Sequence, residues 1–150
     1  AREAGIRVVH LRLGVVLSSK GGALKKMLPA FKWGLGGKLG NGRMWMSWID
    51  LEDAANAFVF AMRHPEMKGA YNLTSPNPVR NLDFTKCLGR ALRKPTFLPA
   101  PAPVLKLVLG EMGETLLLHS TRVQPTALSE TGYTFRYPDL RGCLQNQLNV

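Results

Sequence analysis

The sequence predicts an α/β protein that contains part of a parallel sheet and ends in a small α+β subdomain. Ile6–Leu17 is a nearly continuous run of valine, leucine and isoleucine, which is typical of a central strand covered on both faces of a parallel sheet. The patterns that follow have the order strand, helix, helix, strand, helix, which fits the second half of an α/β sheet. The stretch "PTFLPAPAP" after Lys94 indicates a stiff, extended connection. We therefore expect one domain over residues 1–94 and a second over residues 95–150.

The first domain is predicted to contain three helices. One carries apolar residues at helical spacing from Ala23, and we expect Pro29 to kink it before the glycines of residues 34–37 end it. The second is capped by Asp50, with Asp53 in the position of a capping-box acid. The buried stripe of this second helix is predicted to comprise Leu51, Ala54, Ala55, Phe58 and Met62.

The rest of the chain supplies shorter patterns. A strand is expected at residues 70–74, and Asn81 is suited to cap the third helix. The buried face of that helix would carry Phe84, Leu88 and Leu92. Beyond the proline-rich connection we expect a helix from Val104, a helix from about Pro125 ended by Gly132, a strand at residues 133–138 and a last helix capped by Asp139.

The composition limits the number of domains and the classes of protein to which the chain can belong. With 150 residues, of which 45% are hydrophobic, the chain is long enough for one domain or part of one. It contains no run of roughly 18 apolar residues and no signal peptide, so we expect no membrane partner and a cytoplasmic location, or an organelle stroma or matrix. Cys87 and Cys143 have neither disulfide nor zinc-ligand spacing, which predicts a reducing compartment and no metal. The isolated His10 and His119 are expected to be structural.

The net charge of +10 would favour a polyanionic partner if the charges were clustered. They are mostly scattered over predicted helix faces, and no basic stripe is interleaved with aromatic residues. We therefore expect no nucleic-acid partner.

Two quoted stretches carry a family resemblance. The segment "LRLGVVLSSKGGALKKMLPAFKWGLGGKLGNGRMWMSWIDLEDAANAF…GAYNLTSPNPVRN" resembles the C-terminal half of an extended short-chain dehydrogenase/reductase of the NAD-dependent epimerase/dehydratase group, in particular family 39U. The segment "LGEMGETLLLHSTRVQPTALSETGYTFRYPDL" is similar to the C-terminal domain of unknown function that ends those proteins. The resemblance implies the second half of a Rossmann-like doubly wound parallel sheet, and a chain that is a fragment.

The same resemblance implies that the reaction chemistry lies upstream of this chain. Family members bind NADP or NAD through a glycine-rich turn after their first strand, and they carry a catalytic Tyr-x-x-x-Lys pair before the strand that begins here at Ile6. Neither is present: "GLGGKLGNG" follows a helix, and Tyr71, Tyr133 and Tyr137 have no lysine four residues later. We expect no catalytic residue in this chain and no activity from it alone.

The loop Met44–Trp48 is the predicted substrate-binding element. In the family this region closes over the substrate side of the cleft, and Met44, Trp45 and Trp48 offer the large, adaptable apolar surface that walls a pocket. Alternatively, the two tryptophans are core residues that fix the loop to the sheet. The adjacent Asp50 stands where relatives often carry histidine.

Arg12, Gly14 and Val15 are the predicted cofactor contacts. An arginine inside a buried strand needs an anion nearby, and the matching arginine in relatives lies close to the cofactor. Gly14 and Val15 follow at the strand end, where a backbone without a side chain permits close approach of a nicotinamide ring. The alternatives are a structural ion pair for Arg12 and a tight packing site for Gly14.

Two classes of function therefore remain open. The first is the substrate-facing part of an NAD(P)-dependent oxidoreductase or nucleotide-sugar epimerase-like protein, which acts on an unknown small molecule. The second is a non-catalytic binding or regulatory protein that keeps the same scaffold. The sequence does not choose between NAD and NADP and does not indicate an oligomeric state.

Overall fold

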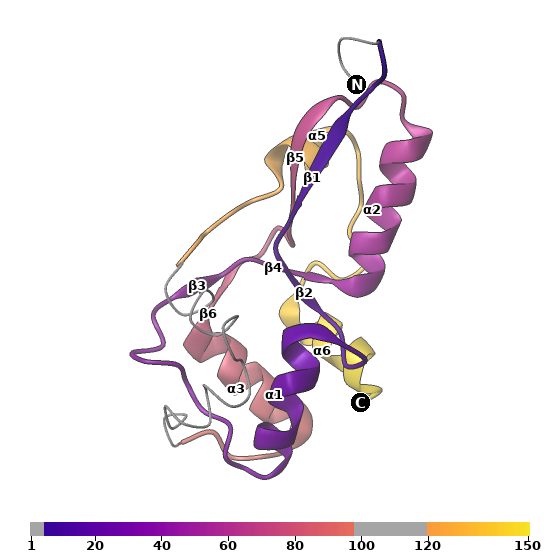
Figure 1. Ribbon diagram of the computed structural model, residues 1–150. Helices are drawn as coiled ribbons and strands as arrows, with labels where there is room; N and C mark the ends of the chain where they lie inside the picture. Colours follow the sequence, from indigo (N-terminus) through magenta and orange to yellow (C-terminus); the bar gives the residue numbers. More distant parts are fainter. Residues whose placement is uncertain (1–4, 98–119) are drawn as a thin grey trace.

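The computed structural model describes residues 5–97 and 120–150 (Figure 1). The described elements are β1 (Val9–Leu13), β2 (Val15–Leu17), α1 (Gly22–Lys32), β3 (Trp45–Met46), β4 (Trp48–Asp50), α2 (Leu51–Arg63), β5 (Gly69–Leu73), β6 (Val79–Arg80), α3 (Asn81–Leu92), α5 (Thr126–Glu130) and α6 (Leu140–Leu148). The predicted α/β class is confirmed, with two pairs of parallel strands. None of the helices in the described ranges is long and apolar enough to span a membrane.

The expected single strand Ile6–Leu17 is two strands that separate at Gly14. β1 pairs in parallel with β5, whereas β2 pairs in parallel with β4, so the chain leaves one partner and joins another. Within the described ranges β1 pairs along one edge only, and its residues Arg12 and Leu13 are exposed. The expectation that this whole run is buried on both faces is therefore wrong for this chain.

The helix α1 follows the sequence pattern. It runs through Pro29 and ends at Lys32, and Gly34 beyond it adopts a φ of 74°, which favours glycine. Its buried face consists of Ala23, Leu24, Met27, Leu28 and Phe31.

The helix α2 buries a different face from the predicted stripe. Asp50 is its N-cap and accepts a hydrogen bond from the Glu52 N–H at 2.7 Å, as predicted. Asp53 does not complete a capping box, because its carboxylate is used by the C-terminal segment. The buried residues are Asp53, Ala54, Ala57 and Ala61, whereas the predicted Leu51, Ala55, Phe58 and Met62 are exposed. Small alanines let the helix lie close to the strands, and the bulkier side chains turn outward.

The helix α3 starts one residue earlier than expected. Its N-cap position is Arg80, and the side-chain oxygen of Asn81 instead accepts a hydrogen bond from the Leu39 N–H at 2.7 Å. Phe84 and Leu88 are buried as predicted, and Leu92 is half-buried. The helix ends at Arg93, which adopts a left-handed conformation.

The C-terminal segment differs from the prediction at one element. α5 and α6 lie where helices were expected, but residues 133–138 form no strand. Asp139 is the N-cap residue of α6, yet its carboxylate accepts a hydrogen bond from the Asn77 side chain rather than from a helix N–H. The helix expected from Val104 and the residue His119 lie outside the described residues.

The buried residues form two cores, which lie at opposite ends of the view in Figure 1. In one core α6 packs with α1 and α3, and in the other Leu128 of α5 and Tyr133 pack with α2 and β5. β4 joins the two, because Trp48 belongs to the first core and Ile49 to the second. The described residues on both sides of the expected boundary at residue 95 therefore share the two cores.

Candidate functional site

A cavity of about 730 Å³ lies at the carboxyl ends of β1 and β5. Its lining residues are Arg12, Leu13, Gly14, Val15, Val16, Leu17, Gly22, Ala23, Met27, Leu39, Met44, Trp45, Met46, Ser47, Asn72, Thr74, Asn81, Phe84, Thr121 and Val123. This is the edge of a parallel sheet at which doubly wound folds bind ligands, and the volume lies within the roughly 300–1,000 Å³ of small-molecule sites. The position and size therefore make it the candidate functional site.

The cavity brings together five of the six residues predicted for cofactor or substrate. Arg12, Gly14, Val15, Met44 and Trp45 all line it. Arg12 lies at the end of β1, and β2 begins at Val15, directly after Gly14. β2 pairs with β4, and β4 directly follows the loop that carries Met44 and Trp45, so the pairing brings the two sets of residues together.

Trp48 does not line this cavity. Its side chain is fully buried in the core, and its indole N–H donates to the Asn77 carbonyl at 3.0 Å. These contacts favour the alternative role, in which Trp48 fixes the loop to the sheet.

Arg12 is exposed, so its charge is solvated in this chain and burial imposes no need for an anionic partner. The buried environment assumed from the sequence is therefore wrong here, although the residue does lie at the cavity. Gly14 has a packing role, because a Cβ placed on it would lie 2.6 Å from the Ser47 carbonyl oxygen and 2.8 Å from Cγ2 of Thr74. These contacts support the alternative of a tight packing site, and the predicted cofactor contact of Gly14 stays a prediction.

Two arginines that sequence analysis did not single out lie against Trp45. The guanidinium carbon of Arg80 lies 4.6 Å from the ring centroid, and that of Arg122 lies 4.7 Å from it. Arg80 is held in place because its guanidinium also donates to the Arg43 carbonyl at 2.8 Å. No spacing in the sequence indicates this arrangement, since β6 and the C-terminal segment supply the two side chains.

The C-terminal segment also closes one wall of the cavity. The Ser47 hydroxyl donates to the Thr121 carbonyl at 2.6 Å and accepts a hydrogen bond from the Val123 N–H at 2.9 Å. The Thr74 hydroxyl donates to the Val123 carbonyl at 3.4 Å. The residues after 120 therefore help to shape the cavity formed by residues of the first domain.

The described residues offer no assembled catalytic group at this cavity. No cluster of three histidine, cysteine or acidic side chains in the described ranges could hold a metal ion. Burial raises the pKa of the Cys87 thiol and of the Cys143 thiol, which disfavours the reactive thiolate form. Burial likewise raises the pKa of the Tyr133 hydroxyl, which donates to the Asp53 carbonyl at 2.7 Å. These groups are structural.

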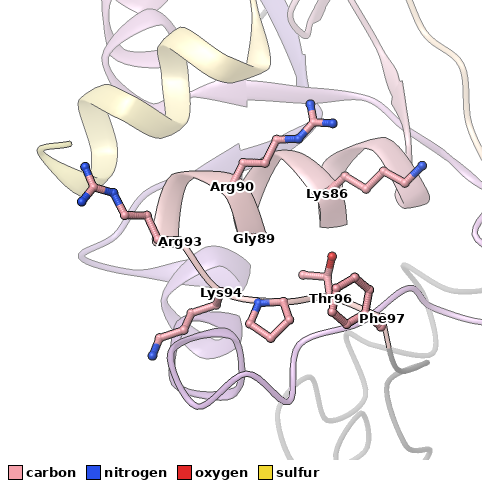
Figure 2. Close-up of a pocket in the computed structure, with 8 residues that line it drawn as sticks. Lys86, Gly89, Arg90, Arg93, Lys94, Thr96 and Phe97 are labelled. Carbon is pink, nitrogen blue, oxygen red and sulfur yellow. The ribbon is translucent and has the colours of Figure 1, made fainter.

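A second hollow, of about 240 Å³, lies between α3 and residues 94–97 (Figure 2). Lys86, Arg90 and Arg93 belong to this basic region, but Figure 2 shows their side chains spreading in different directions. Because the charges do not converge on one point, the hollow has no anion site.

The parallel strand pairs, with α2 connecting β4 to β5 and a ligand-sized cavity at the carboxyl ends of β1 and β5, define a Rossmann-like α/β protein. Residues 1–74 match the NAD dependent epimerase/dehydratase family, and residues 100–147 match a domain of unknown function (DUF1731). The chain therefore combines a segment of this epimerase family with that C-terminal domain.

Curated relatives support the assignment. An epimerase family protein of Mycobacterium bovis is 45% identical over 137 residues, which cover 91% of this chain and 46% of the relative. The chloroplastic homologue of epimerase family protein SDR39U1 from Arabidopsis thaliana is 41% identical over 140 residues, covering 93% of this chain and 40% of the relative. The chain thus spans about half the length of the curated relatives it matches.

Solved structures show the same fold. The human epimerase family protein SDR39U1, crystallised with NADPH, superposes with a TM-score of 0.86 at 34% identity, over 96% of this chain and 49% of the human chain. A nucleoside-diphosphate sugar epimerase from Corynebacterium glutamicum gives a TM-score of 0.78 at 33% identity, over 99% of this chain and 27% of that one. The Rossmann-like class predicted from the sequence is confirmed by these matches.

Proposed function

We propose that this chain forms the substrate-facing part of an NAD(P)-dependent oxidoreductase or epimerase-like protein. The observation that carries the proposal is the cavity at the carboxyl ends of β1 and β5, which collects Arg12, Gly14, Val15, Met44 and Trp45. In a doubly wound sheet the ligand lies across this edge, so one cavity can serve both the nicotinamide end of a dinucleotide and the substrate.

The described residues fit one end of such a cofactor. The exposed guanidinium of Arg12 can donate to an anionic or amide group, and the strand end at Gly14 and Val15 offers a flat apolar wall to a nicotinamide ring. The dinucleotide, when bound, supplies hydride transfer. NADP is the preferred form, because the human relative is described with NADPH.

The chain's own residues then bind and orient the substrate. Met44 and Trp45 line the cavity and keep water from the reacting centre. No residue of this chain is assigned to proton transfer, because it has no Tyr-x-x-x-Lys pair. The glycine-rich turn and this pair belong to a preceding segment of the kind that the longer relatives contain.

The full-length protein provides the test. Replacing Arg12 by alanine should raise the Kd for NADPH roughly tenfold, as measured by nicotinamide fluorescence, since one charge-assisted hydrogen bond is worth about 1.5–3 kcal/mol. Arg63→Ala, which alters an exposed arginine of α2 that does not line the cavity, is the matched control. Equal affinities in both variants would rule out the cofactor role of Arg12. Tight NADPH binding without turnover of any substrate would favour the non-catalytic alternative.

A further inference from the structure

We propose that the cavity selects a small molecule with an apolar, planar body and one anionic group, a carboxylate or a phosphate, in preference to a polyhydroxylated sugar. The inference rests on the proposed function in one respect, which is that this cavity binds the substrate.

The interior of the cavity is apolar. Leu17, Met27, Leu39 and Phe84 belong to the buried core and also line the cavity. Met44 and Met46 extend this surface toward Trp45, and their flexible thioethers adapt to flat or irregular apolar shapes. Such a wall binds an apolar body through burial of apolar surface and offers a sugar ring no hydrogen bonds.

Three of the polar side chains in the lining are already engaged within the protein. Ser47 both donates and accepts a hydrogen bond with the segment of residues 121–123, and Thr74 donates to Val123. Asn81 accepts from the Leu39 N–H and donates to the sulfur of Met46 at 3.8 Å. A sugar would compete with these bonds for its several hydroxyls, with Asn72 and Arg12 as further polar side chains in the lining, and each buried hydroxyl left unpaired weakens binding.

The cationic groups at and next to the cavity are arginines. Arg12 is the charged residue among the described lining residues. Arg80 and Arg122 do not line the cavity, but their guanidinium groups lie against the ring of Trp45, which does. Arg80 is oriented by the Arg43 carbonyl, so little side-chain freedom is lost when it binds a ligand. Guanidinium groups pair with carboxylates and phosphates through parallel hydrogen bonds, which places the anionic group of the ligand beside Trp45.

Calorimetric titration of the 150-residue chain with matched probes tests the inference. The probes are 2-naphthoate, 2-naphthyl phosphate, the neutral 2-naphthylmethanol, and glucose 6-phosphate, which keeps the anion but replaces the apolar body. We expect the two naphthyl anions to bind at least tenfold more tightly than the other two compounds, and the order of the two anions identifies carboxylate or phosphate as the preferred group. Equal binding of the neutral probe, tighter binding of glucose 6-phosphate, or no binding of any probe by folded chain would overturn the proposal.

Variants connect binding to the two arginines. Arg80→Gln and Arg122→Gln should each reduce the preference for the anionic over the neutral naphthyl probe by about fivefold or more, whereas Arg80→Lys and Arg122→Lys should retain part of it. Arg63→Gln is the control, because this exposed residue lies on α2, whereas Arg80 and Arg122 lie against the cavity residue Trp45. Circular dichroism confirms folding of each variant, and an unchanged preference in both glutamine variants would contradict the inference. No dinucleotide is present, so a failure of the cofactor proposal leaves this result unaffected.

Discussion

Asp53 links the first domain to the C-terminal segment through a buried carboxylate. Its side chain is 1% exposed and accepts hydrogen bonds from the Arg136 N–H at 2.8 Å and the Tyr137 N–H at 2.9 Å. These bonds use backbone groups that a strand at residues 133–138 would have needed. The strand expected at residues 133–138 is therefore wrong, because these hydrogen bonds hold the segment against one carboxylate of α2.

Replacing Asp53 by asparagine should lower the free energy of unfolding by about 1–3 kcal/mol, because an amide nitrogen cannot accept one of the two backbone N–H bonds. Urea unfolding followed by circular dichroism measures the loss. The control is Glu52→Gln, which removes the exposed ion pair between Glu52 and Arg136 and should change stability by only about 0–1 kcal/mol. Equal losses in the two variants would contradict a specific role for the Asp53 carboxylate.

The stability should also depend on pH through Asp53. Burial raises the pKa of its carboxyl above the ordinary value, and the nearby Asp50 and Glu52 act in the same direction, while the two backbone N–H donors oppose the shift. A carboxyl with a raised folded-state pKa contributes most stability below its unfolded pKa of about 3.9 and loses that contribution as the pH rises through the folded value. The difference in unfolding free energy between the wild-type chain and Asp53→Asn should therefore shrink as the pH rises above about 4. A difference that grows with pH would show that the two backbone N–H donors lower the pKa of the Asp53 carboxyl more than burial raises it.

Gly14 is fixed by the close approach of Ser47 and Thr74. Gly14→Ala should cost about 1–3 kcal/mol, because its methyl group would overlap the Ser47 carbonyl and the Thr74 side chain. Gly142→Ala is the matched control: this glycine lies inside α6, and a Cβ there would meet no atom within 4 Å. Since alanine favours a helix, the control should gain up to about 1 kcal/mol. Thermal unfolding of both variants distinguishes the two effects by sign.

At the scale of elements, the placement of α2 depends on a single arginine. One guanidinium nitrogen of Arg7 donates to the carbonyls of Ala61 at 3.0 Å, His64 at 3.3 Å and Met67 at 3.1 Å. The Ala61 carbonyl lies in the last turn of α2, where carbonyls lack a partner within the helix, and His64 and Met67 follow the helix. Arg7 therefore ties the segment before β1 to the end of α2 and to the residues after it.

Arg7→Met, which keeps the apolar stem, should lower the unfolding free energy by about 1–3 kcal/mol through loss of charged hydrogen bonds. Hydrogen exchange should also speed up at residues 61–69, near the end of α2, more than in α1. Arg63→Met, on the exposed side of the same helix, serves as the reference and should leave exchange unchanged. Uniform acceleration across the chain would indicate a global effect instead of a local one.

At the scale of the whole molecule, α2 exposes large apolar side chains and β1 lacks a second strand partner within the described ranges. Leu51, Phe58 and Met62 of α2 are 44%, 46% and 69% exposed, and β1 pairs along one edge only within the described ranges. Such surfaces mark sites of contact with further polypeptide. This agrees with a chain that spans about half the length of its relatives.

The 150-residue chain alone should not bind NADPH or NADH tightly. A pyrophosphate is held by backbone N–H groups at a glycine-rich turn between a strand and a helix, and this sequence contains no such turn. Calorimetric titration with each dinucleotide measures the affinity, and we expect dissociation constants weaker than about 1 mM, which corresponds to about 4 kcal/mol of binding free energy. Micromolar binding would mean that the main cofactor site lies within this chain.

Local patterns in the sequence determined the α/β class, the helices α1, α2, α3 and α6, and the loop that carries Met44 and Trp45. These features follow from hydrophobic periodicity, helix caps and proline or glycine breaks, which act over a few residues. The family resemblance added the prediction of cofactor contacts at Arg12, Gly14 and Val15, which stays a prediction.

Only the tertiary structure decided which faces these elements bury. The alanine face of α2 packs inward because small side chains permit close approach to the strands, and the role of Trp48 depends on its position between two cores. Arg80 and Arg122 can lie against Trp45 only because β6 and the C-terminal segment meet β3. Asp53 can accept its hydrogen bonds only because the same C-terminal segment reaches α2. These contacts join residues far apart in the chain, and no local propensity encodes them because their free energy arises only when the distant segments pack together.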